Sequence, residues 1–278
     1  MNISFYATFK PLGHHMQSGD LVIAAGLYRY LDNRGHHLQV ASNLRTRWIF
    51  WRPWLAALLP LERRNSKAAT ARVPADLWLT YHSYYKGPDV LGPYVAGRLN
   101  IPYVIFQGAY ATKWRKKWHT RSGFYLNRKA LLAADHGFAN TRVDYHTLMR
   151  LLPEHHVSYA PPGIYPDEFA YNDNSRRELR RQWNVDTEPV IVTAAMFRKG
   201  VKTESLTWVI RVCAILRNRG RSLRLVIVGG RNSSETYIEQ LMRRWGNLIV
   251  RLPMRPQEKM PEVLAAAHAI VVPQRDTA

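Results

Sequence analysis

Basic residues surround a glycine in a short loop, and their spacing suits the binding of an anion. Arg198, Lys199 and Lys202 lie close to Gly200, and a helix is expected to begin at about Thr203. The first backbone N–H groups of a helix and the positive end of its dipole attract anions, and neighbouring cationic side chains add to that attraction. The loop is interpreted as a phosphate site, with a solvated basic loop as the alternative.

The segments on either side of this loop form a predicted βαβ unit. Residues 190–195 are apolar and rich in β-branched side chains, which is typical of a strand buried on both faces. An apolar stripe at helical spacing follows, and Gly220 is placed to end that helix. Residues 223–228 are a second buried run that ends at Gly229 and Gly230. Ligands of such units bind where the strands give way to loops.

Three segments in order resemble glycosyltransferase family 4, the retaining transferases of the GT-B fold. The sequence Met-Phe-Arg-Lys-Gly-Val-Lys at 196–202, followed by Leu-Val-Ile-Val-Gly-Gly at 225–230, resembles the donor-binding half of these enzymes. Upstream, residues 160–169 resemble the segment that crosses between their domains, and residues 258–273 resemble their next helix and strand. The matches are spread over about two fifths of the chain, from residue 160 to residue 273, and each is weak alone.

The resemblance implies a nucleotide-sugar donor linked to UDP, GDP or ADP, and neither a cofactor nor a metal ion. Arg198 and Lys202, with Lys199 as an alternative, would neutralise the diphosphate and stabilise it as it leaves. Fixed cations stabilise a transition state most where negative charge develops. The catalytic residues implied are Arg198 and Lys202, and the donor-binding residues are Gly13, Lys199, Gly229, Gly230 and Met254.

The first half of the chain opens in the same way as the second. Residues 2–9 are apolar, and turn residues follow, then an apolar stripe at helical spacing that Gly35 can end. Residues 36–41 supply a second strand. The sequence therefore predicts an α/β protein of two doubly wound, Rossmann-type domains with parallel sheets, similar to the GT-B fold. The expected domains are an acceptor-side domain at 1–162 and a nucleotide-sugar-binding domain at 163–278.

Polar residues after the predicted strands of the first domain are expected to bind the acceptor. Gly13 resembles the glycine turn that family members place near the donor phosphate and the acceptor, and His14 follows it. His82 follows a strand predicted at residues 77–81, and Gln107 stands where family members often carry a histidine close to the acceptor. The predicted acceptor residues are therefore His14, His82 and Gln107. A histidine at a strand end is also common as a structural residue, and no carboxylates at ligand spacing support a metal site.

Tryptophan alternates with arginine and lysine in two stretches, residues 45–64 and 113–121. These residue types suit an anionic membrane surface, where the rings lie at headgroup level, and they also suit stacking on single-stranded nucleic acid. A third interpretation is that some tryptophans are core residues and the cations are solvated. We favour a sugar or lipid-linked acceptor, such as a lipopolysaccharide core, at an anionic membrane surface, and we disfavour nucleic acid.

Composition limits the classes of protein that remain. The chain has 278 residues, 46% of them apolar, and a formal net charge of +20, which attracts phosphates and other anions. Apolar tracts long enough to cross a bilayer are missing from the sequence, so we expect a cytoplasmic protein, peripheral on the inner face of the plasma membrane. The single cysteine, Cys213, excludes an internal disulfide. A dehydrogenase is disfavoured because no Gly-x-Gly-x-x-Gly follows either leading strand, whereas a non-catalytic nucleotide- or sugar-binding module remains an alternative.

Family members continue past the strand represented here by residues 269–273 into a segment with two glutamates, one facing the sugar and one the ribose. The sequence ends at Ala278, before that segment. The resemblance thus implies an incomplete second domain and a chain that is itself inactive, with a naturally shortened homologue as the alternative. Such a chain is expected to expose apolar surface in its second domain.

Overall fold

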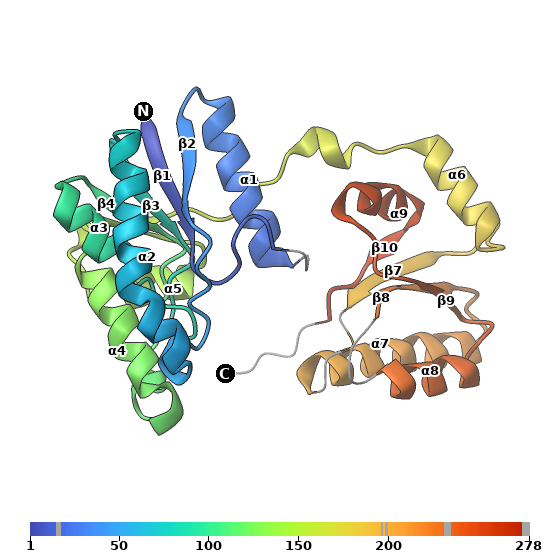
Figure 1. The fold of residues 1–278 in the computed structure, drawn as a ribbon. Helices are drawn as coiled ribbons and strands as arrows, with labels where there is room; N and C mark the ends of the chain where they lie inside the picture. The colour runs from blue at the N-terminus through green and yellow to red at the C-terminus, as the bar shows by residue number, and fades with distance from the viewer. Residues whose placement is uncertain (15–17, 196, 198–199, 231–234, 274–278) are drawn as a thin grey trace. The chain divides into compact units, whose positions relative to one another are not determined.

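The structure is a computed structural model that describes the chain except residues 15–17, 196, 198–199, 231–234 and 274–278, and except the side chains of Lys202 and Glu235. It divides into two compact units, Met1–Ile164 and Tyr165–Ala278 (Figure 1). The division falls two residues after the predicted boundary between 162 and 163. Each unit contains one sheet, and the strands described in it pair in parallel. The predicted α/β class with two parallel, doubly wound sheets is confirmed.

The sheet of the first unit has the strand order β2-β1-β3-β4-β5-β6. The chain therefore reverses its direction of strand addition beside β1, and loops on the two sides of this point part to leave room for a ligand. The strands are β1 Asn2–Ala7, β2 His37–Ser42, β3 Leu77–Tyr81, β4 Tyr103–Phe106, β5 His136–Ala139 and β6 Val157–Tyr159.

Apolar side chains on β1 point alternately to the two faces of the sheet, which explains why helices cover both faces. Ile3 and Phe5 belong to the cluster that packs against α1, whereas Tyr6 belongs to the cluster packed against α2, α3 and α4. Successive side chains of a strand point to opposite faces, so an apolar strand needs cover on each. The helices are α1 Gly19–Asn33, α2 Pro53–Arg72, α3 Gly92–Leu99, α4 Trp118–Leu132 and α5 Arg142–Leu148, with 3-10 turns at Ile49–Trp51, Thr112–Arg115 and Glu154–His156.

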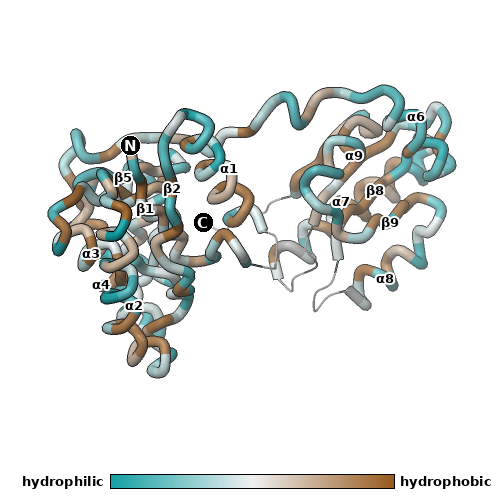
Figure 2. Tube along the Cα trace, turned by 45° about the horizontal axis from the view of Figure 1, so that its top comes forward, coloured by the Kyte–Doolittle hydropathy of each residue, from teal (hydrophilic) through white to brown (hydrophobic). Residues whose placement is uncertain are grey.

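The second unit repeats this arrangement on a smaller scale, in the order β10-β7-β8-β9. Helices α7 and α8 cover one face of its sheet, and α6 and α9 cover the other (Figure 1). Strands β8 and β9 are largely apolar (Figure 2). The elements are α6 Asp173–Gln182, β7 Val190–Ala195, α7 Val201–Asn218, β8 Arg224–Gly229, α8 Glu235–Arg244, β9 Ile249–Leu252, α9 Met260–Ala266 and β10 Ala269–Ile270, with 3-10 turns at Pro166–Phe169 and Gln257–Lys259.

A buried carboxylate holds the segment after β3 in place. Asp89 is 2% exposed, and its carboxylate accepts hydrogen bonds from the N–H groups of Leu91 and Gly92, at 2.8 and 2.9 Å, and from the hydroxyl of Tyr103 at 2.8 Å. Burial raises the pKa of Asp89, and hydrogen bonds from Thr80 and these partners offset part of that rise. A buried carboxylate with so many donors fixes α3 against the sheet and sets the path of the loop before it.

The structure differs from the predicted elements mainly in its helices. The helix predicted to begin at about Thr203 begins two residues earlier, at Val201, and the strand predicted at residues 2–9 ends at Ala7. The tryptophan-rich stretches, for which the sequence predicted no element, run from loops and 3-10 turns into the first turns of α2 and α4. Pro60 lies inside α2, and a proline normally argues against a helix interior.

Candidate active site at the carboxyl ends of the strands

The predicted site residues follow the carboxyl ends of parallel strands, which meet at one edge of each sheet. We call the loops at this edge the first-unit rim and the second-unit rim. The first-unit rim comprises residues 8–14, 43–48, 82–87 and 107–110, and the described part of the second-unit rim comprises Phe197, Gly200, Gly230 and residues 253–255.

A histidine and a carboxylate form an ion pair at the first-unit rim. His82 follows β3, and its Nδ1 lies 3.1 Å from Oδ1 of Asp20 in the first turn of α1. Burial alone would raise the pKa of Asp20, but the hydrogen bond and charge of His82, with Lys10, hold that pKa below its usual value. The carboxylate is therefore ionised near neutral pH and fixes the orientation of the imidazole. A ring held in this way can exchange a proton with a substrate hydroxyl through its other nitrogen.

Aromatic packing and backbone geometry hold His82 further. Its ring stacks on that of Tyr84, with centroids 4.5 Å apart and planes inclined by 20°. Its backbone has a φ of 61°, which is uncommon outside glycine and frequent at functional sites. The Thr8 hydroxyl donates a hydrogen bond to the His82 carbonyl. Burial, followed by the charge of Asp20, raises the pKa of Tyr84, so its hydroxyl stays neutral.

Gln107 lies after β4, and its backbone also has a positive φ, of 64°. Its Oε1 accepts a hydrogen bond of 3.3 Å from the amide of Asn140, which follows β5. Asn140 Oδ1 is buried and has no partner among the residues that the structure describes. The pair offers amide groups of the kind that bind sugar hydroxyls.

Gly13 and His14 lie in the turn between β1 and α1. The N–H of His14 donates to the carbonyl of Pro11 at 3.0 Å, which closes the turn. A Cβ at Gly13 would meet nothing within 4 Å, so the turn itself does not require glycine. Gly13 belongs to the first unit, whereas the other residues predicted to bind the donor belong to the second.

The helix expected after the basic loop begins at the second-unit rim. Gly200 caps α7 with φ 93° and ψ −146°, a conformation that side chains disfavour, and the N–H groups of Thr203 and Glu204 donate to its carbonyl. The N–H groups at the start of such a helix are left for an anion. Arg198 and Lys199 lie outside the described residues, and so does the side chain of Lys202. Their roles stay predictions.

Close packing of the second-unit rim requires a glycine. Gly229 pairs with Ala195 across β7 and β8, has a φ of 138°, and a Cβ on it would lie 1.9 Å from the carbonyl oxygen of Ala195. Gly230 also has a positive φ, of 135°. Met254 follows β9 and is 56% exposed. Gly229, Gly230 and Met254 therefore lie at the same edge as the start of α7.

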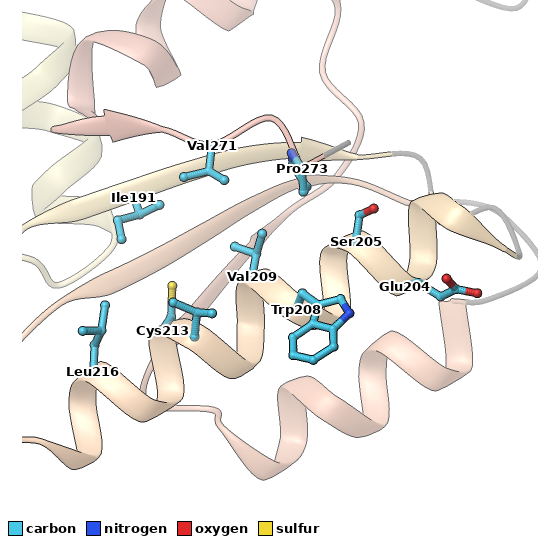
Figure 3. Close-up of a pocket in the computed structure, with 10 residues that line it drawn as sticks. Ile191, Glu204, Ser205, Trp208, Val209, Cys213, Leu216, Val271 and Pro273 are labelled. Carbon is cyan, nitrogen blue, oxygen red and sulfur yellow. The ribbon is translucent and has the colours of Figure 1, made fainter. Parts of the chain in front are cut away.

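An apolar groove of about 640 Å³ lies in the second unit, between α7 and the segment around β10 (Figure 3). Trp208, Val209 and Cys213 line it from α7, and Val271 lines it from the segment after β10. Its walls carry few polar groups, so they do not suit a diphosphate.

The described residues contain no cluster of three histidine, cysteine or acidic side chains suited to a metal ion. Their helices are all too short or too polar to cross a membrane.

Sequence reasoning missed the partners of the predicted residues. Asp20, Tyr84 and Asn140 were given no functional role. An acidic residue in the first turn of a helix that follows a strand was the one available signal.

No protein-family model matches the chain, and no curated protein sequence matches it. Solved structures share its fold. HepE of Anabaena in complex with UDP superposes with a TM-score of 0.70 at 13% identity, over 97% of this chain and 73% of that one. WaaG, a glycosyltransferase involved in lipopolysaccharide biosynthesis, gives 0.61 at 15% identity, over 96% and 74%. UDP-GlcNAc 2-epimerase of Methanocaldococcus jannaschii gives 0.60 at 10% identity, over 98% and 78%. At these identities the likeness establishes the fold alone.

We expect substitutions of Asp20 and His82 to have non-additive effects on the free energy of unfolding. In a double-mutant cycle with Asp20→Asn and His82→Gln, the coupling should be about 1 kcal/mol, because each single substitution removes one partner of the same contact. The folded-state pKa of Asp20 is lowered, so its contribution is present above the usual value of 3.8 and is lost as pH falls through the folded value. Urea unfolding between pH 3 and 6 measures this, and strictly additive variants would contradict the pairing.

Gly229→Ala should lower the free energy of unfolding by about 2–4 kcal/mol, because the new Cβ would overlap a backbone carbonyl at a positive φ. Gly13→Ala is the matched control, since its Cβ has open space, and it should change stability by less than about 0.5 kcal/mol. Chemical unfolding followed by circular dichroism compares the two. Equal stability of both variants would show that β7 and β8 do not approach as described.

Proposed function

We propose that the protein is a glycosyltransferase that moves a sugar from a nucleotide sugar to an acceptor with retention at the anomeric carbon. The proposal is supported by the start of α7, which begins at Val201, a short loop after β7 ends at Ala195. In the sequence, Arg198, Lys199 and Lys202 adjoin this helix start. HepE, of similar fold, has been solved with UDP and with UDP-glucose. A diphosphate is the anion that such an arrangement fits best.

In the proposed reaction, the bond between the anomeric carbon and the phosphate oxygen breaks, and a nucleoside diphosphate leaves. Arg198 and Lys202, with Lys199 as an alternative, stabilise the charge that develops on the leaving oxygen. The acceptor oxygen bonds to the anomeric carbon on the same face, and its proton passes to the departing phosphate. The residues named require no metal ion, because cations and backbone donors supply the positive charge.

The first unit is proposed to hold the acceptor. His82, oriented by Asp20, would contact an acceptor hydroxyl, and Gln107 and His14 would contact further hydroxyls. A carboxylate that holds the imidazole in one orientation leaves its other nitrogen available for a hydrogen bond. That hydrogen bond would position the acceptor hydroxyl for attack.

A lipid-linked or envelope acceptor at an anionic membrane surface fits the outer face of the first unit. Trp54 on α2 and Trp118 on α4 are 62% and 77% exposed, and Trp51 links the two helices through a 5.5 Å ring contact with Trp118. Residues 112–132 contain seven Lys or Arg and no Asp or Glu. Exposed Leu58 lies one turn from Trp54 and favours lipid over nucleic acid, since an aliphatic side chain cannot stack on bases.

Donor binding is tested by titrating UDP, GDP and ADP into the protein by calorimetry. Arg198→Ala should abolish most of the binding, and in a chain competent for transfer it should cost about 2–4 kcal/mol of transition-state stabilisation. Arg211→Ala is the control, because Arg211 is an arginine within α7 whose guanidinium carbon lies 5.7 Å from the centroid of the Trp208 ring, away from the start of the helix. Identification of the reaction products distinguishes sugar transfer from epimerisation, since a UDP-GlcNAc 2-epimerase has a similar fold. Near-normal binding and turnover in Arg198→Ala would remove the proposed site.

Membrane binding is tested by sedimentation with vesicles of phosphatidylglycerol and phosphatidylcholine. The double variant Trp54→Ala, Trp118→Ala should bind anionic vesicles at least about tenfold more weakly, because each ring buries a large apolar surface at the interface. Trp208→Ala is the control, since Trp208 is 63% exposed but lies in the second unit. Binding to single-stranded DNA that exceeds vesicle binding, or no loss in the double variant, would count against a membrane surface.

A further inference from the structure

Three cations gather at the first-unit rim beside the Asp20–His82 pair. Arg45 and Arg47 lie in the loop after β2, and Lys86 lies in the loop after β3. Because β2, β1 and β3 are neighbours in a parallel sheet, the loops that follow them meet at one edge. All three side chains are half-buried. We call these residues the cationic cluster.

Backbone hydrogen bonds tie the loops of the cluster together. The N–H of Thr46 donates to the carbonyl of Thr8 at 2.9 Å, and the N–H of Trp48 donates to the carbonyl of Lys86 at 2.6 Å. The Thr8 hydroxyl is 2.9 Å from the carbonyl oxygen of Gly87. Loops joined in this way keep their side chains in a fixed arrangement, which lowers the entropy lost when a ligand binds.

Aromatic rings hold the two guanidinium groups. Arg45 Nε donates to the carbonyl of Phe9 at 2.9 Å, and the guanidinium carbons of Arg45 and Arg47 lie 5.8 and 5.3 Å from the centroid of the Phe9 ring. The ammonium of Lys86 lies 5.7 Å from the Trp48 ring. Contacts with ring faces position a cation without neutralising its charge.

The cluster lacks a compensating negative charge. No carboxylate among the described residues forms an ion pair with Arg45, Arg47 or Lys86. Burial, and then the charges of Arg47 and Arg52, lower the pKa of Arg45, and burial with the charge of Arg47 lowers the pKa of Lys86. The Nε of Arg47 is buried and has no partner in the described part of the chain. Half-buried like charges with unused donors favour an anion.

Tyr84 links the cluster to the histidine. Its ring contacts Phe9, with centroids 5.4 Å apart, and it stacks on His82. Asp20 is paired with His82 and is therefore not a partner for the cluster. An anionic group on the cations would place the rest of its molecule along Tyr84 toward the imidazole.

We propose that Arg45, Arg47 and Lys86 bind an anionic group, a phosphate or a carboxylate, carried by the acceptor. That the ligand is the acceptor rests on the proposed function, whereas anion binding is inferred from the cationic cluster itself. The proposal narrows the acceptor to a charged sugar or a phosphate-bearing lipid, because a neutral glycan would leave the cations without partners. A bidentate contact from either guanidinium is the geometry that arginine offers to both anions.

The test uses the full chain with Arg198→Ala as the background, so that phosphate bound at the second unit does not interfere. Inorganic phosphate, glucose 6-phosphate and glucose are titrated at constant ionic strength, and Tm is followed. Phosphate and glucose 6-phosphate should raise Tm, and glucose should not. Arg45→Gln and Arg47→Gln should weaken both effects at least about fivefold, because each removes a charged donor.

Arg98→Gln is the matched control, since Arg98 is exposed in the same unit and its guanidinium lies 5.6 Å from the Tyr94 ring. It should leave the phosphate effect unchanged. Arg47→Gln should also keep or raise Tm in the absence of anion, because it relieves repulsion between like charges, whereas loss of a structural arginine would lower it. Arg47→Lys should keep part of the phosphate effect, because it keeps the charge but loses the guanidinium fork.

Vesicles of phosphatidylglycerol serve as a second probe and identify the source of the phosphate. Tighter binding of glucose 6-phosphate than of vesicles indicates a phosphorylated sugar. Tighter binding of vesicles, if Arg45→Gln abolishes it, indicates a lipid headgroup. Both results support the site. No phosphate effect in the Arg198→Ala background, or an equal effect in Arg45→Gln and Arg47→Gln, overturns the proposal. Loss of nucleotide binding in Arg198→Ala is a separate result, so failure of one proposal does not decide the other.

Discussion

The parallel pairing of strands is the constraint on which the rest of the structure depends. Every strand of a parallel sheet ends at the same edge. Residues that are distant in sequence therefore lie at one rim because of the strand pairing, whether or not they contact each other. In the first unit this places His82 beside the first turn of α1 and Gln107 beside Asn140, and in the second it places Gly229 at the same edge as the start of α7. Chemistry at both rims follows from this arrangement and from the few residues that each strand end carries.

The strands and the fold class could be predicted from the sequence because a strand buried on both faces is a short apolar run. β3 and β7 coincide with such runs, and the turns after α1 and α7 carry the glycines expected there, Gly35 and Gly220. The helix α2 was not predicted, because Trp54, Leu58 and Leu61 are exposed although Leu55 and Leu59 pack against the core, and Pro60 interrupts the pattern. Periodicity identifies a helix clearly only when its apolar residues are confined to one face.

The candidate site could be predicted only one residue at a time. His82 was identified from its place at a strand end, but its pairing with Asp20 depends on β1 and β3 being neighbours, which composition does not encode. The cationic cluster illustrates the same limit. Arg45 and Arg47 were noted as part of a basic tryptophan-rich stretch, yet their loop places both guanidinium groups over the Phe9 ring, whereas the exposed Trp54 of the same stretch lies on α2. Function at this rim therefore depends on loop geometry more than on residue type.

The central claim is that the rim of the second sheet binds a nucleoside diphosphate at the N-terminus of α7. Hydrogen–deuterium exchange with and without UDP, GDP or ADP tests it directly, because a phosphate bound to the first N–H groups of a helix slows their exchange. The account predicts slower exchange in peptides that cover 196–205 and 228–235 with at least one of these nucleotides. Protection confined to the first unit or to the apolar groove around Trp208, with none at the start of α7, would contradict it.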